Sequence, residues 1–374
     1  MIPGWKVKRE LLRLRQQLSW YAELLHARSR TRNYDRDRPK LVQRHDGPRS
    51  LGPRVAALLI FQPVDIPGSI LETCDLLTEL GYSVLVVSNG TLMAPARAKL
   101  VPHVWRLLER PNLGYDFGGY REAVMHLWDE GVEPEELLIL NDSAWVIAEA
   151  FPAFLDRLRQ MEVDVAGTVL RSKKAKYWLE SYFFQLRRPA LTSSAFREFW
   201  THYLLVDSKF GVIRQGERDF TVALAAGGLR IGALGDNPDF LARMAEVSDE
   251  ELRLAIAYAA PVPGALADER TRLLTASPAA DWRLRVLAHI DAVLDGKRNW
   301  HTHFPIASIR TMGYPFLKKS REQITVDWQQ LVLRAIQDGV VPKLSGQVMA
   351  ELFERQKHAI KQTPQWIAHR SPGV

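Results

Sequence analysis

Short apolar runs separated by polar connections mark the part of the chain after residue 54. Residues 55–61 (VAALLIF) and 82–88 (YSVLVVS) are bounded by turn residues, which is typical of strands buried on both faces. Between them, residues 68–80 carry apolar positions at helical spacing. A strand, a helix and a strand with short connections form a βαβ unit, so this region predicts a parallel sheet.

The same pattern predicts further elements along the chain. We expect strands at 104–108, 136–140, 163–170 and 177–186, the last of them central because it is apolar on both faces. Residues 211–234 predict a polar turn, a helix and a returning strand. Residues 236–298 are predicted to be mostly helical, and the segment from 324 to about 361 to form two helices.

The N-terminal segment carries an apolar stripe with alternating spacings of four and three residues. The stripe consists of Val7, Leu11, Leu14, Leu18, Tyr21 and Leu25. This spacing predicts a helix over 1–30 that docks on the protein's own body or on a second subunit. The alternative is a basic amphipathic helix that lies on an anionic membrane. Residues 28–54, rich in Arg, Asp, Pro and Gly, predict a mobile linker.

Composition narrows the class of protein. The 374 residues are 47% hydrophobic and 25% charged, with one cysteine, which excludes a wholly disordered chain and a disulfide scaffold. Residues 1–50 carry a net charge of +8 and the remainder −1, so the basic charge is not spread over a folded face as in nucleic-acid-binding proteins. No apolar run approaches the ~20 residues of a membrane span. We expect a soluble cytoplasmic protein, free or resting on the inner face of the cytoplasmic membrane.

Polar residues cluster where the predicted strands end. Gln62 and Asp65 follow the first strand, and Asn141, Asp142 and Ser143 follow the strand at 136–140. Ligands of parallel α/β sheets bind beyond the carboxyl ends of the strands. A carboxylate there suits a metal-bound diphosphate or a sugar hydroxyl. The alternative for the triplet is an Asx turn or a helix cap.

The loop at 110–120 (RPNLGYDFGGY) is a third such cluster. Its glycines allow close approach of a ligand to the backbone, and the helix that follows has an N-terminus that attracts anions. The loop matches neither the dinucleotide-binding nor the P-loop glycine pattern. Because Asp116 repels a phosphate unless a metal ion intervenes, we assign it to ribose, base or sugar hydroxyls. The alternative is a glycine-rich turn in which Asp116 caps the helix.

Two further groups of residues could carry chemistry. Glu217 and Asp219 lie in the polar turn before the helix, where one of them could act as a general base or merely favour the start of the helix. His301 and His303 would face the same side of a strand, as metal ligands could, with Asp142 as a distant oxygen ligand.

The order of these blocks resembles the rhamnan synthesis protein F family of glycosyltransferases. The blocks that carry the resemblance are RPNLGYDFGGYREAV, LLILNDSAW, YWLESYFFQLRR, IRQGERDFTVALAAGGLRI and NWHTHFPIASIRTMGYPFLKK. They extend from about residue 55 to residue 319. The resemblance implies a GT-A-like nucleotide-binding α/β fold with a mixed, mainly parallel sheet and with N- and C-terminal helices. With the elements predicted from the pattern, the expected organisation is a helix and linker over 1–51, a glycosyltransferase domain over 52–320 and a helical tail over 321–374. The helical insertion at 236–298 lies within that domain but has no counterpart in the resemblance.

The resemblance also implies roles for individual residues. Asn141-Asp142-Ser143 stands in the place of the Asp-x-Asp motif of GT-A enzymes with a single carboxylate, which weakens the case for metal dependence. Gly216-Glu217-Arg218 stands in the place of a Gly-Glu-Asp turn, so Glu217 is the preferred base and Asp219 the second choice. A Mg²⁺ or Mn²⁺ ion would be held by Asp142 and His303. The residues implied for nucleotide-sugar binding are Gln62, Asp65, Asn112, Gly114, Tyr115, Asp116, Asn141, Asp142, Ser143, His303 and Lys318.

The function implied is transfer of a sugar, such as rhamnose, from a nucleotide-sugar donor to an oligosaccharide or lipid-linked acceptor of a bacterial cell-surface polysaccharide. A non-catalytic scaffold of the same fold is the alternative, favoured by Arg218 and by the single carboxylate of the triplet. A dinucleotide-dependent oxidoreductase is disfavoured because no GxGxxG follows the first strand. We expect a membrane surface or a second copy of the chain as the partner of the N-terminal helix, and no nucleic acid.

Overall fold

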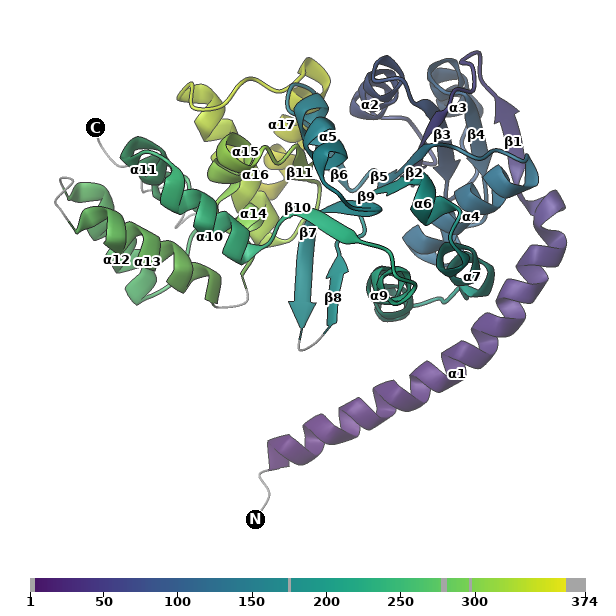
Figure 1. The fold of residues 1–374 in the computed structure, drawn as a ribbon, viewed down its shortest axis with the longest axis horizontal. Coiled ribbons are helices and arrows are strands. Elements are labelled where there is room, and N and C mark those ends of the chain that lie inside the picture. Colours follow the sequence, from purple (N-terminus) through teal and green to yellow (C-terminus); the bar gives the residue numbers. More distant parts are fainter. Residues whose placement is uncertain (1–3, 174–175, 277–280, 296–297, 361–374) are drawn as a thin grey trace. The chain divides into compact units, whose positions relative to one another are not determined.

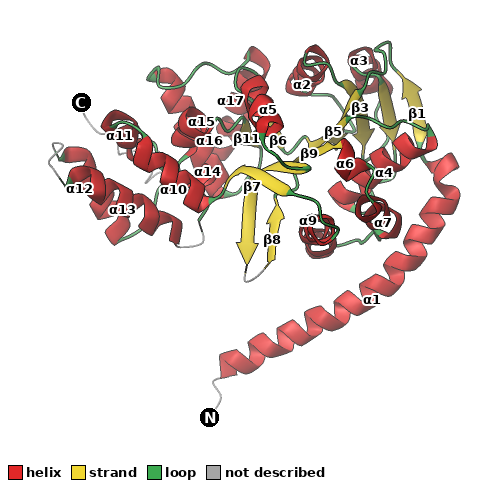
Figure 2. Cartoon of the chain, in the orientation of Figure 1, coloured by secondary structure: helices red, strands yellow, loops and turns green. Residues whose placement is uncertain are grey.

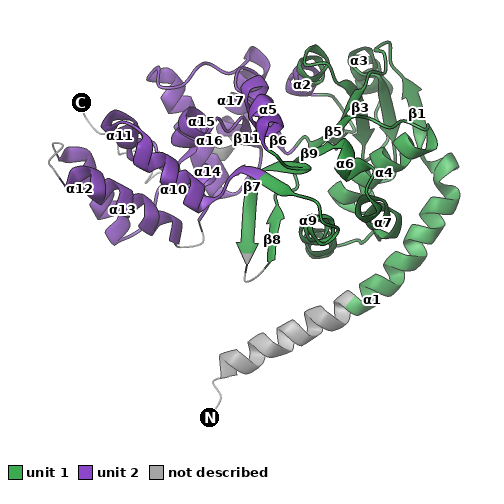
Figure 3. Cartoon of the chain, viewed as in Figure 1, with its two compact units in different colours: residues 1–66, 74–142, 162–232 green, residues 67–73, 143–161, 233–374 purple. Residues whose placement is uncertain are grey.

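A computed structural model describes residues 4–173, 176–276, 281–295 and 298–360. The chain forms two compact units, which Figure 3 shows in different colours. Unit 1 comprises residues 1–66, 74–142 and 162–232, and unit 2 comprises residues 67–73, 143–161 and 233–374.

Unit 1 is built on the large sheet, whose strands are yellow in Figure 2. The strands are β1 (Gln43–Asp46), β2 (Arg54–Ile60), β3 (Ser83–Ser88), β4 (Arg106–Glu109), β5 (Glu136–Asn141), β7 (Val165–Lys173), β8 (Lys176–Leu179), β9 (Phe183–Arg187) and β10 (Ile231–Gly235). Their spatial order is β1-β4-β3-β2-β5-β9-β7-β10, with β8 beside β7. The last residues of β10 belong to unit 2.

The centre of the sheet is parallel. Strands β4, β3, β2 and β5 pair in parallel, whereas β1 on β4, β9 on β5 and β7 on β9 pair antiparallel. The chain runs outward from β2 through β3 to β4 and then returns to place β5 on the other side of β2. The strand order therefore reverses between β2 and β5. The predicted α/β fold with a mixed sheet and terminal helices is confirmed.

The apolar runs read from the sequence form this parallel centre. All six residues of β3 and of β5 are buried, as a strand with both faces covered requires. The helices of unit 1 are α1 (Gly4–Leu41), α3 (Ala94–Leu100), α4 (Tyr115–Asp129), α6 (Arg188–Leu191), α7 (Ser194–His202), α8 (Lys209–Gly211) and α9 (Asp219–Ala226). Helix α4 packs very closely on β2, because a Cβ on Gly119 would lie 2.2 Å from the Leu59 side chain. Helix α2 (Gly68–Glu79) contributes residues to both units.

Two predictions about secondary structure in unit 1 are wrong. Residues 28–54 are not a mobile linker, because α1 continues to Leu41 and β1 then pairs with β4. The Tyr34 side chain of α1 is buried and donates a hydrogen bond of 2.6 Å to Glu122 of α4. Residues 177–186 do not form one strand but parts of β8 and β9, separated by a turn at residues 180–182.

Unit 2 is mainly helical, as Figure 1 shows. Its helices are α5 (Phe151–Gln160), α10 (Asn237–Glu246), α11 (Asp249–Ala257), α12 (Ala265–Thr275), α13 (Trp282–Asp295), α14 (Trp300–His303), α15 (Pro305–Met312), α16 (Gln323–Gln337) and α17 (Gly346–Ile360). Strands β6 (Ala144–Val146) and β11 (Phe316–Lys318) pair antiparallel. In the part of the chain that the structure describes, we find no helix with the length and apolar character needed to cross a bilayer.

Candidate functional site

The reversal of strand order between β2 and β5 brings two predicted site residues into contact. Asp142 follows β5, and its Oδ2 accepts hydrogen bonds from the Gln62 side chain (2.8 Å) and from the Phe61 backbone amide (3.2 Å), both of which follow β2. The half-buried Asp142 carboxylate is thus held at the switch point of the sheet by two neutral donors. Ligands of open α/β sheets bind at such points.

Asp116, in the first turn of α4, joins the same cluster. The buried Asn141 donates a hydrogen bond of 3.1 Å to its carboxylate, and Asn141 directly precedes Asp142. Burial, and after it the negative charge of Asp142, raises the pKa of Asp116 to about 6. The nearby Lys209 opposes this increase in pKa. The predicted cleft residues Asp116, Asn141 and Asp142 therefore lie together.

Glu217 is the third carboxylate of the cluster, because its charge also raises the pKa of Asp116. It lies in the π-helical turn Val212–Arg218, which the sequence predicted as a polar turn. Ser181 and Trp178 donate hydrogen bonds of 2.8 and 3.1 Å to its two oxygens. Burial is the largest cause that raises the pKa of Glu217.

A close contact explains the glycine that precedes Glu217. A Cβ on Gly216 would lie 2.5 Å from the ring of Phe117, which is buried at the start of α4. Glycine therefore lets the π-helical turn approach the segment that carries Asp116. Asp219, by contrast, is exposed and lies near the charges of Lys176, Arg214 and Arg218.

The other predicted site residues of unit 1 lie in the loops around this cluster. Asp65 is exposed, 3.3 Å from the Lys99 ammonium group. Asn112 and Tyr115 are exposed on the loop before α4, where Gly114 adopts a left-handed backbone with φ of 75°.

Three predicted site residues belong to unit 2 instead. Ser143 is exposed and is the first residue of the 143–161 segment of unit 2, and its carbonyl oxygen accepts a hydrogen bond of 2.8 Å from the Lys319 amide. His303 ends the short helix α14, so His301 and His303 do not lie on one face of a strand. Burial lowers the pKa of His303. Lys318 ends β11. Pairing of His303 or Lys318 with the unit 1 cluster stays a prediction.

The described residues contain no group of three or more His, Cys, Asp and Glu side chains that is placed to hold a metal ion. The switch point offers the two carboxylates of Asp116 and Asp142. Mg²⁺ is commonly held by one or two carboxylates together with substrate phosphates, so these residues fit an ion that arrives with a diphosphate.

Sequence reasoning missed several residues that hold the site in place. Ser181 and Trp178 orient Glu217, and Asn89 donates a hydrogen bond of 3.0 Å to the Tyr115 carbonyl. Arg110 is almost fully buried and donates a hydrogen bond of 2.7 Å to the Leu113 carbonyl. The polar Asn89 at the end of β3 is a signal of the same kind as the polar residues after β2 and β5, but Asn89-Gly90 by itself predicts only a turn that ends the strand.

Comparison with known proteins supports the resemblance over part of the chain. Residues 84–246 match the family described as "Rhamnan synthesis protein F", which confirms the predicted resemblance for that segment. The segment includes the loop with Asp116, the triplet at Asn141 and the turn with Glu217, but not the histidine block. A curated relative, the uncharacterized protein y4gN of Sinorhizobium fredii, is 27% identical over 261 residues, which cover 69% of this chain and 68% of that protein.

Two solved structures are also similar to the chain. The mannosyltransferase PcManGT from Pyrobaculum calidifontis, in complex with GDP-Man and Mn²⁺, is 13% identical with a TM-score of 0.31, and the match covers 85% of this chain and 96% of that one. A glycosyltransferase involved in glycosylation of the major capsid of PBCV-1 is 13% identical with a TM-score of 0.23, and the match covers 39% of this chain and 65% of that one.

Proposed function

We propose that the chain is a GT-A-like glycosyltransferase that moves a sugar from a nucleotide-sugar donor to a hydroxyl of an oligosaccharide or lipid-linked acceptor. The observation that carries the proposal is the meeting of Asp142, Gln62 and Asp116 at the switch point, with Glu217 beside them. The family match supports a role in bacterial cell-surface polysaccharide synthesis, and rhamnose as the donor sugar is part of the proposal. We place the reaction in the cytoplasm or at the inner face of its membrane.

The donor would bind over the carboxyl ends of β2, β4 and β5. Asp116 and Asn141 offer oxygen and amide groups to the hydroxyls of ribose or of the donor sugar. Exposed Tyr115 and Asn112 lie on the loop that borders this surface. Because Asp116 and Asp142 are both acidic, a diphosphate needs a cation beside them. A Mg²⁺ or Mn²⁺ ion held by these two carboxylates would supply neutralisation of the leaving diphosphate.

Glu217 is the proposed general base. Its two oxygens are held by Ser181 and Trp178, so the carboxylate keeps a fixed orientation toward an acceptor hydroxyl. The hydroxyl proton passes to Glu217 as the acceptor oxygen forms a bond to the anomeric carbon and the bond to the diphosphate breaks. Burial brings the pKa of Glu217 nearer to neutrality, which improves a general base.

Matched substitutions of the two acids test this proposal. Glu217→Gln keeps the hydrogen-bonding shape but cannot accept the proton, so transfer should fall by about 10²–10⁴-fold while donor binding changes little. Asp219→Asn should transfer at a rate near that of the wild type because its side chain is exposed. Transfer from a panel of nucleotide sugars and donor affinity by calorimetry provide the two measurements.

The outcomes separate a transferase from a scaffold. Donor binding by the wild type without transfer to any acceptor would favour the scaffold. An inactive Asp219→Asn beside an active Glu217→Gln would move the base to Asp219.

A further inference from the structure

The backbone is strained immediately before Asp116. Among the described residues, Tyr115 is the only non-glycine with a positive φ, at 50°, and it follows Gly114 at 75°. A side chain in this left-handed region costs about 1–3 kcal/mol, so it persists only where neighbouring contacts determine the conformation. The Tyr115 side chain is exposed, so the contacts that hold this conformation are those made by the backbone of the loop.

Two polar side chains make those contacts. Asn89, at the end of β3, donates a hydrogen bond of 3.0 Å to the Tyr115 carbonyl, and Arg110, at the end of β4, donates one of 2.7 Å to the Leu113 carbonyl. Arg110 also donates a short hydrogen bond to the side-chain oxygen of Asn89 and so orients its amide. The Arg110 guanidinium group thus makes one hydrogen bond to the loop itself and orients the Asn89 side chain that makes the other.

Burial of the Arg110 charge at this place costs free energy. Its side chain is only 1% exposed, and no carboxylate of the described residues lies within ion-pair distance of it. The Arg110 Nε donates a hydrogen bond of 3.1 Å to the hydroxyl of Tyr34 in α1, and that hydroxyl donates one of 2.6 Å to Glu122. Burial of a charge with neutral partners is costly, and a purely structural need could be met by an apolar side chain.

We propose that Arg110 is a positioning residue that holds Asp116 through the 111–115 loop, and that Tyr34 of α1 completes the arrangement. The planar guanidinium bonds three acceptors that belong to α1, the end of β3 and the loop. The N-terminal helix is thereby part of the support of the site. The effect on transfer rests on the proposed function, whereas the effect on the loop does not.

Hydrogen–deuterium exchange of residues 111–118 tests the proposal directly. Arg110→Lys retains the charge but not the fork of donors, so the Gly118 amide, which bonds the Gly114 carbonyl at 2.9 Å, should exchange at least about tenfold faster. Tyr34→Phe removes one hydrogen bond and should give a smaller increase in the same peptide. If Arg110→Lys fails to fold, Tyr34→Phe alone decides the question.

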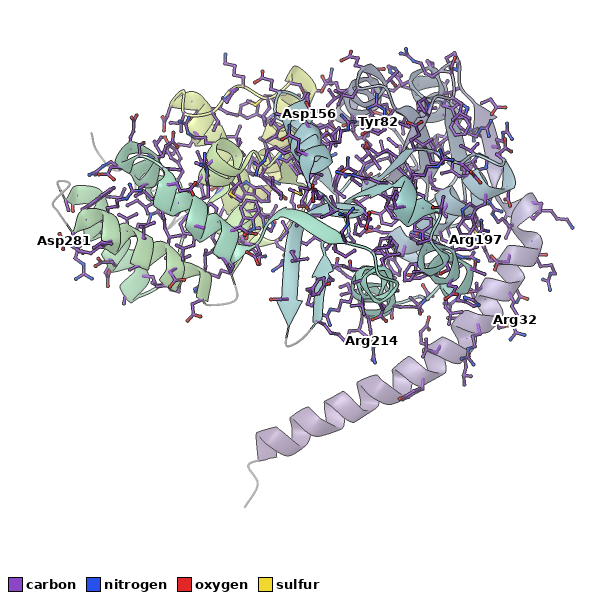
Figure 4. All side chains as sticks on the ribbon, viewed as in Figure 1. Arg32, Tyr82, Asp156, Arg197, Arg214 and Asp281 are labelled. Carbon is purple, nitrogen blue, oxygen red and sulfur yellow. The ribbon has the colours of Figure 1, made fainter. Side chains whose placement is uncertain are left out.

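Tyr82→Phe is the matched control. Tyr82, labelled in Figure 4, is buried in unit 1 and bonds Glu136 at the amino ends of the strands. Its loss removes a Tyr–Glu hydrogen bond like that of Tyr34, but it should leave exchange at 111–118 unchanged. Equal increases in Tyr82→Phe and Arg110→Lys, or no increase in either Arg110→Lys or Tyr34→Phe, would overturn the proposal.

Relief of the strain gives a readout that loss of packing would not produce. In the Arg110→Lys background, Tyr115→Gly should restore part of the protection at Gly118, because glycine adopts the left-handed backbone without steric strain. If Tyr115→Gly restores no protection of the Gly118 amide, Arg110 does not act by positioning the loop. In an active preparation, Arg110→Lys should also lower transfer by about 10²-fold, as a misplaced functional group does. If the wild-type protein transfers no sugar, the proposed function is wrong. The exchange experiment would still decide whether Arg110 holds the loop.

Discussion

Two groups of acidic side chains in unit 1 differ in what surrounds them. At the outer edge of the sheet, Asp46 and Glu130 each lie 2.9 Å from the buried Arg106 and also bond Arg44. At the switch point, Asp116 and Asp142 bond amide groups of Asn141, Gln62 and the backbone. Arginine side chains form ion pairs with the first group, whereas among the described residues no ion pair reaches the second, to which Lys209 is the nearby cation.

The pKa values follow this difference. A hydrogen bond from Arg44 lowers the pKa of Asp46, and one from Arg106 lowers that of Glu130. Burial raises the pKa of both Asp116 and Glu217. Acidic groups whose charge is uncompensated in the folded protein are common where a ligand completes the arrangement. The outer edge therefore contributes to stability, whereas the acidic side chains at the switch point suit the substrate site that we propose.

Truncation of the N-terminus should produce the largest effect on the outer edge. Deletion of residues 1–50 removes β1, Arg44, Asp46 and the buried Tyr34, so we expect a loss of several kcal/mol, comparable with the entire stability of many domains. Deletion of residues 1–20 retains all these groups and should lower the urea midpoint less than deletion of residues 1–50. Equal stability of the two truncated proteins would show that α1 and β1 do not support the fold.

Removal of the central cation of the outer edge should have a smaller effect. Arg106→Met leaves Asp46 and Glu130 facing water and Arg44, so the free energy of unfolding should fall by about 1–3 kcal/mol. Specific transfer activity per folded molecule should not change. Arg36→Met, which breaks an exposed ion pair with Asp37, serves as the control and should have no measurable effect in the same urea titration.

Removal of the Asp116 charge at the switch point should increase stability, whereas removal of the Arg106 charge decreases it. The unfolded Asp116 carboxyl ionises near pH 4 and the folded one near 6, so its ionisation destabilises the fold progressively from pH 4 to 6 and fully above pH 6. Asp116→Asn should therefore stabilise the protein by about 1–2 kcal/mol at pH 7 and by nothing near pH 4. Urea titrations at both pH values check this, and a loss of stability at pH 7 would contradict the view of an uncompensated carboxylate.

Local patterns were sufficient where an element depends on its own residues. The apolar runs of β2, β3 and β5 predicted buried parallel strands, because such strands are covered on both faces whatever the details of their neighbours. The carboxyl ends of parallel strands meet at one edge, so the grouping of Gln62, Asp116 and Asp142 followed from strand order alone.

Patterns failed where partners distant in the sequence decide the conformation. Residues 28–41 are rich in Arg and Asp and predicted a linker, yet they are helical and packed, because Tyr34 bonds Glu122 and Arg121 bonds Asp35. The histidine block suggested metal ligands on one face of a strand, yet it forms α14, where His301 contacts the rings of Trp300, Tyr314 and Trp328. Burial of polar side chains in these places depends on partners that local periodicity does not reveal.

The sequence alone therefore determined the parallel centre of the sheet, the polar residues at its strand ends and the family resemblance around them. Tertiary structure decided which of those residues share a site: Glu217 joins Asp116, while Asp219 stays exposed. It also decided that Arg110 and Tyr34, which carry no motif, hold the loop before Asp116. The physical reason is that hydrogen bonds to buried groups are made across the fold, between residues whose positions become neighbours only when the chain has folded.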